Sequence, residues 1–189
     1  RQELWHKGAT SGNTLTVVLS ATNAVEETGV PVVLTGITWD LPTGIVLTPV
    51  SATAESLINA VSGAVIGSGT NVSSKWLYND GLNSGIVGSV GAFAVYSLYL
   101  GAEINAGVGG TWLHLDPNSE CMGPGPCNLQ SVNGSNYGVV ADVFNGSSAF
   151  PSIAYVQNEV TLKWTISGGT LAANDIAGVM PVFGQQGQP

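Results

Sequence analysis

Charged side chains are scarce in this sequence. Its 189 residues include four basic and 12 acidic ones, and the formal net charge is −8. The basic residues are scattered along the chain, so they form no basic patch that could neutralise a phosphate backbone. The composition therefore argues against a nucleic-acid-binding protein. It also differs from that of a cytosolic enzyme, which usually stays soluble through mixed Lys and Glu.

Long hydrophobic runs are missing as well. The most apolar stretch, residues 87–100, is interrupted by Gly88, Gly91 and serines, and it falls short of the roughly 20 apolar residues that a membrane-spanning helix needs. We therefore expect a buried strand there and no membrane span. No signal peptide heads the sequence, so a secreted protein would be represented here by its mature part.

Cys121 and Cys127 are the only cysteines. Together with the one nearby histidine, His114, they are too few for a structural zinc site. Two prolines lie between them and would bend the intervening chain, so we expect a small disulfide loop, which forms in an extracytoplasmic compartment. The alternative is a pair of reduced cysteines in a loop.

Histidine is equally rare, because His6 and His114 are the only two. No Gly-x-Ser-x-Gly turn precedes a helical segment, which argues against a hydrolase with a Ser–His–Asp triad. A paired-carboxylate mechanism could draw on acidic residues, but each of these is better explained as a turn cap or a solvated strand face. We expect no catalytic residues and no enzyme; the carboxylates considered are Asp40, Asp116, Asp142 and Glu159.

The sequence is rich in short alternating segments instead. Residues 157–167 place Val160, Leu162, Trp164 and Ile166 on one side of an extended chain and polar residues on the other. This pattern predicts a half-buried β-strand, and the β-branched and aromatic content agrees.

Further strands are expected at intervals of about ten residues, with Gly, Pro and Asn turns between them. Residues 54–61 have the most helical character in the sequence, but this segment is short and ends in a Ser-Gly turn. We therefore predict an all-β fold, an antiparallel, jelly-roll-like β-sandwich with little helix. The domain would span residues 13–184, between an N-terminal arm (1–12) and a C-terminal tail (185–189); the expected strands are 14–20, 30–41, 45–53, 75–78, 88–100, 112–115, 137–144, 157–167 and 179–183.

The order of several motifs resembles the extracellular portion of bacterial proteins that carry a PEP-CTERM sorting signal. The motifs are residues 12–19 (GNTLTVVL), 34–41 (LTGITWDL), 47–53 (LTPVSAT), 75–78 (KWLY), 136–140 (NYGVV), 156–162 (VQNEVTL) and 176–179 (IAGV). The resemblance implies export, sorting by an exosortase, and a place on the cell surface or in the extracellular matrix. It supplies no catalytic residues. The chain departs from the family in its loop 117–127 and in its end, 184–189, which carries no Pro-Glu-Pro signal.

Two groups of oxygen-bearing side chains are weak calcium candidates in an acidic extracellular β-protein. Neither has EF-hand spacing, and both are better read as turns, so we expect no cofactor. The candidate ligands are Asp80, Asn83, Asp116, Asn118 and Glu120.

Three Asn-x-Ser sequons, at Asn71, Asn133 and Asn145, are possible N-glycosylation sites. A glycan there would help to keep so uncharged a surface soluble. The competing interpretation is an ordinary turn, since Asn-Gly is a common hairpin connection.

The five tryptophans suggest either a hydrophobic core or a surface on which sugars stack. Trp39, Trp76 and Trp164 lie among apolar neighbours and should be buried, whereas Trp5 and Trp112 are unassigned, with Trp112 the candidate for glycan stacking.

These observations favour a secreted structural protein that assembles with copies of itself into an extracellular filament or a surface or biofilm matrix. The expected mechanism is addition of a strand from one subunit to the sheet edge of the next, with the arm 1–12 as the donated piece. The alternative is a glycan-binding surface module with extracellular polysaccharide as partner, and a hydrolase is third.

Overall fold

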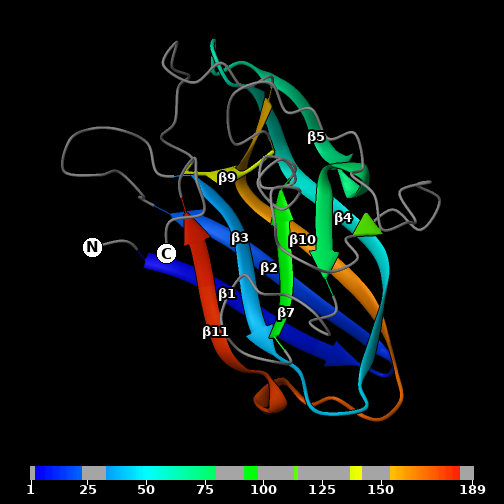
Figure 1. Cartoon of the computed structure of the whole chain (residues 1–189). Helices are drawn as coiled ribbons and strands as arrows, with labels where there is room; N and C mark the ends of the chain where they lie inside the picture. The colour runs from blue at the N-terminus through cyan, green and yellow to red at the C-terminus, as the bar shows by residue number, and fades with distance from the viewer. Residues whose placement is uncertain are drawn as a thin grey trace.

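Strands make up most of the computed structural model, which describes residues 3–22, 33–79, 92–97, 113–114, 137–141 and 154–183 (Figure 1). Two short 3-10 helices, η1 (Ser73–Lys75) and η2 (Ala173–Asp175), are the only helical elements in these ranges. The strands are β1 (Glu3–Ser11), β2 (Thr14–Thr22), β3 (Leu34–Asp40), β4 (Val46–Asn59), β5 (Val65–Asn71), β6 (Trp76–Asn79), β7 (Ala92–Ser97), β8 (Leu113–His114), β9 (Val139–Val140), β10 (Ala154–Ser167) and β11 (Ala177–Phe183).

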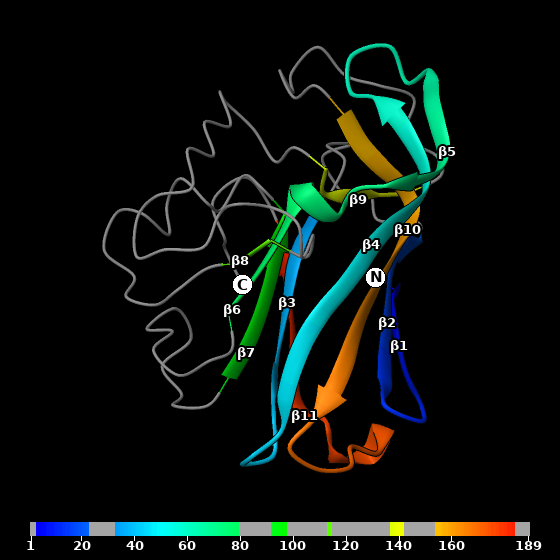
Figure 2. The same cartoon turned by 90° about the vertical axis from the view of Figure 1, so that its right-hand side faces the viewer.

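Five strands form the first layer, in the order β1-β2-β10-β4-β5 (Figure 2). Every neighbouring pair in this layer is antiparallel. The central strand, β10, pairs with β2 along one side and with β4 along the other. The strand predicted at 157–167 is therefore the middle of this layer, which explains why its inward residues are so strongly apolar.

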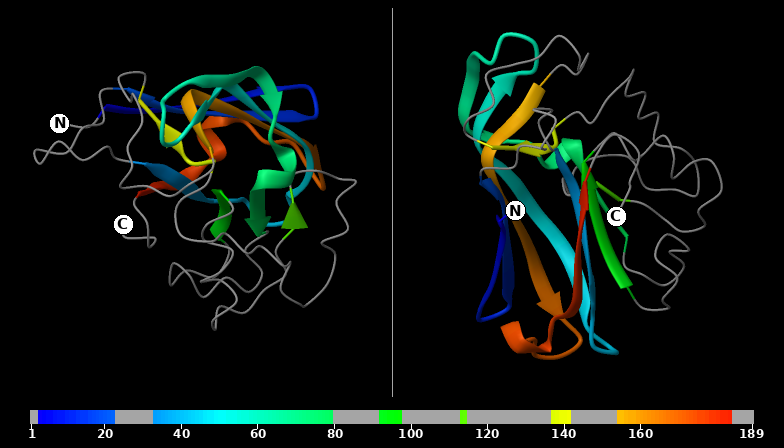
Figure 3. Two further views of the ribbon diagram at one scale, coloured as in Figure 1. Left: turned by 90° about the horizontal axis from the view of Figure 1, so that it is seen from above. Right: turned by 90° about the vertical axis from the view of Figure 1, so that its left-hand side faces the viewer.

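The second layer has the order β11-β3-β7-β6-β8, again with antiparallel pairs. Strand β7 lies between β3 and β6, as the prediction of a central strand within 88–100 required. Seen from above, the two layers lie face to face (Figure 3).

Strand β9 joins the layers. Val139 and Val140 pair in parallel with Val156 and Gln157 of β10, and Val139 also pairs with Leu34 of β3. The predicted all-β, antiparallel fold with little helix is confirmed. The layers are not two independent sheets, however, because hydrogen bonds through β9 make them one continuous sheet.

The core lies between the layers. Leu15, Val17 and Leu19 of β2 point inward, as their alternation predicts. Trp39 of β3 and Trp164 of β10 meet edge-to-face with their ring centroids 5.7 Å apart, so the two layers touch through these rings. The predicted burial of Trp39, Trp76 and Trp164 is confirmed, because all three are at most 2% exposed.

One sequence expectation is wrong. Residues 54–61 are not helical, because residues 46–59 form the long strand β4. Ala, Glu and Leu favour a helix in isolation, but pairing with β10 on one side and β5 on the other overrides that weak local preference. Pro49 lies at an irregularity where Val50 is the extra residue of β4, a kind of strand position at which proline is tolerated.

None of the helices in the ranges that the structure describes has the length and hydrophobicity to cross a lipid bilayer.

Candidate functional site

The open side of β5 is the first candidate site. Among the described residues β5 pairs with β4 alone, so it forms an edge of the first layer. Its side chains are mostly exposed. Val65 and Ile66 are 60% and 55% exposed, and Val61, in the turn before the strand, is 55% exposed. The β4–β5 hairpin therefore presents three aliphatic side chains to solvent at the upper end of the first layer (Figure 2).

A β-bulge sits in the middle of this apolar tip. Leu57 pairs with Gly67 and Ile58 pairs with Val65, so Ile66 has no partner residue on β4. An extra residue of this kind leaves the backbone ladder locally incomplete. The apolar tip therefore coincides with the bulge, at which Ile66 has no partner residue on β4.

Local hydrogen bonds hold the shape of the hairpin turn. The Asn59 side-chain oxygen Oδ1 accepts hydrogen bonds from the backbone N–H groups of Val61 (3.0 Å) and Ser62 (2.9 Å). Two backbone bonds, from Asn59 N–H to Ala64 O and from Gly63 N–H to Asn59 O, close the same turn at 2.9 Å each. The turn that contains Val61 and leads into Val65 therefore has a defined backbone conformation.

The sequon at Asn71 lies at the other end of β5. Ser73 is 3% exposed, and its hydroxyl donates to Asn71 Oδ1 at 2.6 Å while it accepts from the Ala52 backbone N–H at 2.8 Å. Ser73 N–H also donates to Asn71 Oδ1, at 2.9 Å. The serine thus anchors η1 to β4. Asn71 itself is exposed, and these contacts occupy its oxygen, so the amide nitrogen is the atom that a glycan would take.

Strand β1 forms the opposite edge of the first layer. Residues 3–11 pair with β2 along their whole length, from Glu3 opposite Thr22 to Ser11 opposite Thr14. Gly12 has φ +57° and Asn13 does not have a positive φ, the pattern of a type II′ hairpin turn. Residues 3–11 of the expected arm 1–12 are therefore not detached from the domain, because a tight turn folds them onto the chain's own sheet.

Hydroxyl groups line the outer face of the first layer. Thr165 of β10 pairs with Thr14 of β2 and with Thr48 of β4, and Ser11 of β1 pairs with Thr14. Thr48 and Thr165 are exposed. This row of four hydroxyls crosses four strands, and side chains on neighbouring strands lie about 4.8 Å apart. Two further rows on the same face are Thr16–Lys163–Ser51 and Val18–Thr161–Thr53–Asn71.

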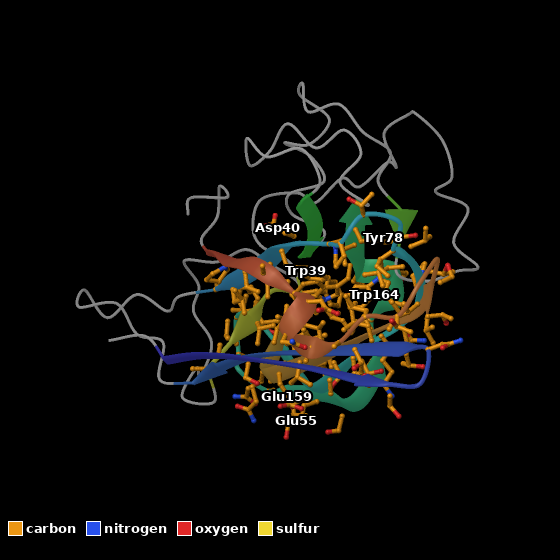
Figure 4. The ribbon with its side chains drawn as sticks, turned by 90° about the horizontal axis from the view of Figure 1, so that it is seen from below. Trp39, Asp40, Glu55, Tyr78, Glu159 and Trp164 are labelled. Carbon is orange, nitrogen blue, oxygen red and sulfur yellow. The ribbon has the colours of Figure 1, made fainter. Side chains whose placement is uncertain are left out.

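Two carboxylates lie at one end of this face. Glu159 and Glu55 are on adjacent strands at the bulge of β10, and Figure 4 shows them on the same side of the molecule. The Ser20 hydroxyl donates to Glu159 Oε2 at 3.5 Å. Asp40, at the end of β3, lies on the opposite side of the molecule in Figure 4. The structure therefore does not bring together Asp40 and Glu159, two of the carboxylates considered as a catalytic pair.

The remaining predicted site residues stay predictions. His6 and His114 belong to β1 and β8, whose side chains are not described at these positions. No group of three or more metal-ligating residues occurs within the described ranges. The predicted residues that lie outside those ranges are Cys121, Cys127, Asn133, Asn145, Asp80, Asn83, Asp116, Asn118, Glu120, Asp142 and Trp112.

Strand β5 was not among the strands expected from the sequence. Its residues are largely Gly, Ser, Thr and Asn, so they lack the apolar–polar alternation that identified the other strands. The signal that could have revealed it is Val65-Ile66 following Ser62-Gly63, a β-branched pair directly after a turn.

Comparisons of the chain with models of protein families, with curated proteins and with solved structures found no match.

Proposed function

We propose that this chain is a secreted structural protein whose copies join edge to edge into an extracellular filament or a surface or biofilm matrix. The observation that carries the proposal is the pair of open edges of the first layer. Within the described residues, β1 and β5 each have a single hydrogen-bonded neighbour strand. A sheet with two open edges can accept further strands on both sides, which is the geometry of an open polymer.

Composition and surface chemistry support the same function. Only 8% of the residues are charged, so large parts of the surface can meet a second copy without bringing like charges together, although the net charge of −8 repels copies at longer range. The outer face is covered largely by hydroxyl groups, which hydrogen-bond to water and to polar polymers alike. The motif order that resembles PEP-CTERM proteins adds the expectation of export and exosortase sorting.

The experiment is to purify the full chain under oxidising conditions and to examine it by electron microscopy and analytical ultracentrifugation. We expect regular polymers, or discrete oligomers that grow with protein concentration. A chain that remains monomeric over the whole soluble concentration range would contradict the proposal.

Donation of β1 to a neighbour is one version of this mechanism. Because β1 is paired with β2 of its own chain, donation means that β1 of one subunit replaces β1 of the next. Deletion of residues 1–10 should then abolish regular polymers, whereas deletion of residues 185–189 serves as the control. Polymers that persist without residues 1–10 would exclude strand donation and leave association through β5 in place.

The hydroxyl rows favour a second candidate function, a module that binds neutral polysaccharide through the outer face of the first layer. A net charge of −8 opposes anionic polymers, so the partner would be uncharged. Co-sedimentation of the chain with an insoluble neutral glucan tests this version. Thr165→Val tests whether the hydroxyl face binds the glucan. Trp112→Ala, measured in parallel, tests the aromatic residue that the sequence suggested for glycan stacking.

A further inference from the structure

We infer that the β4–β5 hairpin is a homotypic contact, at which residues 65–67 of one subunit pair antiparallel with the same residues of a second copy about a two-fold axis. This inference rests on the proposed function and specifies which edge the subunits use. It commits to a second copy as the occupant of the edge. The axis would pass at Ile66, so that each Ile66 pairs with its counterpart and the two side chains lie on the same face of the sheet.

The length of the contact follows from the course of β5. Gly69 has φ +58°, and beyond it the strand turns toward the second layer and leads through η1 into β6 (Figure 2). In the part of the chain that the structure describes, only the first part of β5 is therefore a straight open edge. This part contains Val65, Ile66 and the bulge, and the side chains of Val65 and Ile66 are 60% and 55% exposed.

A comparison of the edges points to β5. Natural edge strands are protected from pairing by charged residues, proline, β-bulges or very short length. Strand β1 carries Glu3 and Lys7, β11 carries Pro181, and β8 has two residues. Strand β5 has no charged residue and no proline. Its bulge shortens the usable edge, which limits the contact to a few residues and makes it weak on its own.

Charge also favours a second copy as the partner. Two copies of a chain with net charge −8 repel each other, and the repulsion is least where charged side chains are absent. No charged residue occurs from Ser56 to Ser74. The nearest on β4 is Glu55, and pairing of two β5 strands would separate the two β4 strands by three strand spacings, about 14 Å. That separation exceeds the Debye length of about 8 Å at physiological ionic strength.

The fold supports this geometry as well. Strand β5 is antiparallel to β4 and all pairs in the first layer are antiparallel, so a two-fold pair would extend the layer in the same pattern. Such an isologous contact closes after two subunits. A filament would then need a second contact, for which β1 at the opposite edge is available.

The test uses complementary charges at position 66. Ile66→Lys and Ile66→Glu each place like charges side by side across the two-fold axis, so each variant alone should weaken association at least about tenfold. An equimolar mixture of the two should recover association, because the introduced ammonium group of one copy then meets the introduced carboxylate of the other. Analytical ultracentrifugation of the full-length chains measures both effects.

Val50→Lys is the matched control, because Val50 is also an exposed aliphatic residue at a bulge but lies on β4, away from the hairpin tip. It should associate like the wild type. Circular dichroism and thermal unfolding check that all three variants fold.

Three outcomes would overturn the homotypic contact. If the mixture associates no better than each variant alone, residue 66 does not face its counterpart. If Ile66→Lys polymerises like the wild type, another edge makes the contact and the proposed structural function still stands. If the wild type itself does not associate, both the contact and the proposed function are wrong.

Discussion

Backbone conformation decides the cost of substitutions at several single residues. Gly168, directly after β10, has φ +79°, and a Cβ atom there would run into the carbonyl oxygen of Gly44 in the turn before β4. Gly12 has a similar φ of +57° but nothing within 4 Å of the equivalent position. A comparison of substitutions at the two glycines therefore separates the cost of a left-handed conformation from the cost of a steric clash.

We predict that Gly168→Ala lowers the free energy of unfolding by about 2 kcal/mol or more, because it adds the clash to the conformational cost. Gly12→Ala should cost only about 1 kcal/mol, the conformational part. Urea denaturation followed by tryptophan fluorescence measures both values. Equal losses at the two positions would show that the Gly168–Gly44 approach is not tight.

Inward and outward positions were the most predictable property of single residues. Alternation identified Leu15, Val17 and Leu19 as core residues because burial on one face of a strand leaves a period of two in the sequence. The buried hydroxyl of Ser73 could not be predicted in this way. Its partners, Ala52 and Asn71, are brought together only by the pairing of β4 with β5.

At the scale of elements, the bulge of β10 shapes the first layer. Gln157 pairs with Ser56 and Val160 pairs with Ala54, so Asn158 and Glu159 together face Glu55. Asn158 has φ +69°, a left-handed conformation that Asn and Gly tolerate better than other residues. The bulge lets β10 change its pairing partner from β9 to β2 along its length.

We predict that Asn158→Ala destabilises the protein by about 1 kcal/mol, because alanine has no side chain that stabilises a left-handed backbone. Asn158→Gly should be close to neutral at the same position. Chemical denaturation of the two variants gives the comparison. A stable alanine variant combined with a destabilised glycine variant would contradict a bulge held by backbone conformation.

Element prediction from the sequence succeeded where strands are apolar on one face, as in β2 and β10. It failed where the residues of a strand do not alternate between apolar and polar. Strand β5 is rich in Gly and Ser, and the second half of β4 contains good helix formers. In both cases the strand exists because a neighbour pairs with it, and such long-range pairing leaves no local signal.

At the scale of the whole molecule, the small number of charged residues and the negative net charge together affect how strongly two copies associate. Two subunits with net charge −8 repel each other at distances beyond direct contact, and dissolved salt screens that repulsion. The proposed β5 contact contains no charged residue, so it has no ion pair that salt could weaken.

We therefore predict that association of the full chain strengthens as ionic strength rises from about 0.01 to 0.15 M, over which the Debye length falls from about 30 to 8 Å. Sedimentation velocity at constant pH measures the effect, with a neutral osmolyte as the control for excluded volume. Weaker association in salt would mean that ion pairs hold the subunits together.

The fold class was predictable from the sequence, since many short alternating segments can bury their apolar faces only in stacked sheet layers. The link between the layers was not. Strand β9 has two residues, too few to leave a pattern, and its parallel pairing with β10 depends on how the whole chain folds. The candidate assembly edge at β5 was not predicted for a similar reason. Whether a strand lies at an edge depends on which strands pair with it in the folded sheet, and the local sequence does not show this.

The contact between Trp39 and Trp164 gives this molecule a built-in optical reporter. Two indole rings 5.7 Å apart and inclined by 76° couple their electronic transitions, and each ring belongs to a different layer. The resulting near-ultraviolet dichroism would vanish if the layers parted while the backbone kept its extended conformation. Spectroscopists could thus follow, without any added label, whether polymer growth leaves the subunit interior closed.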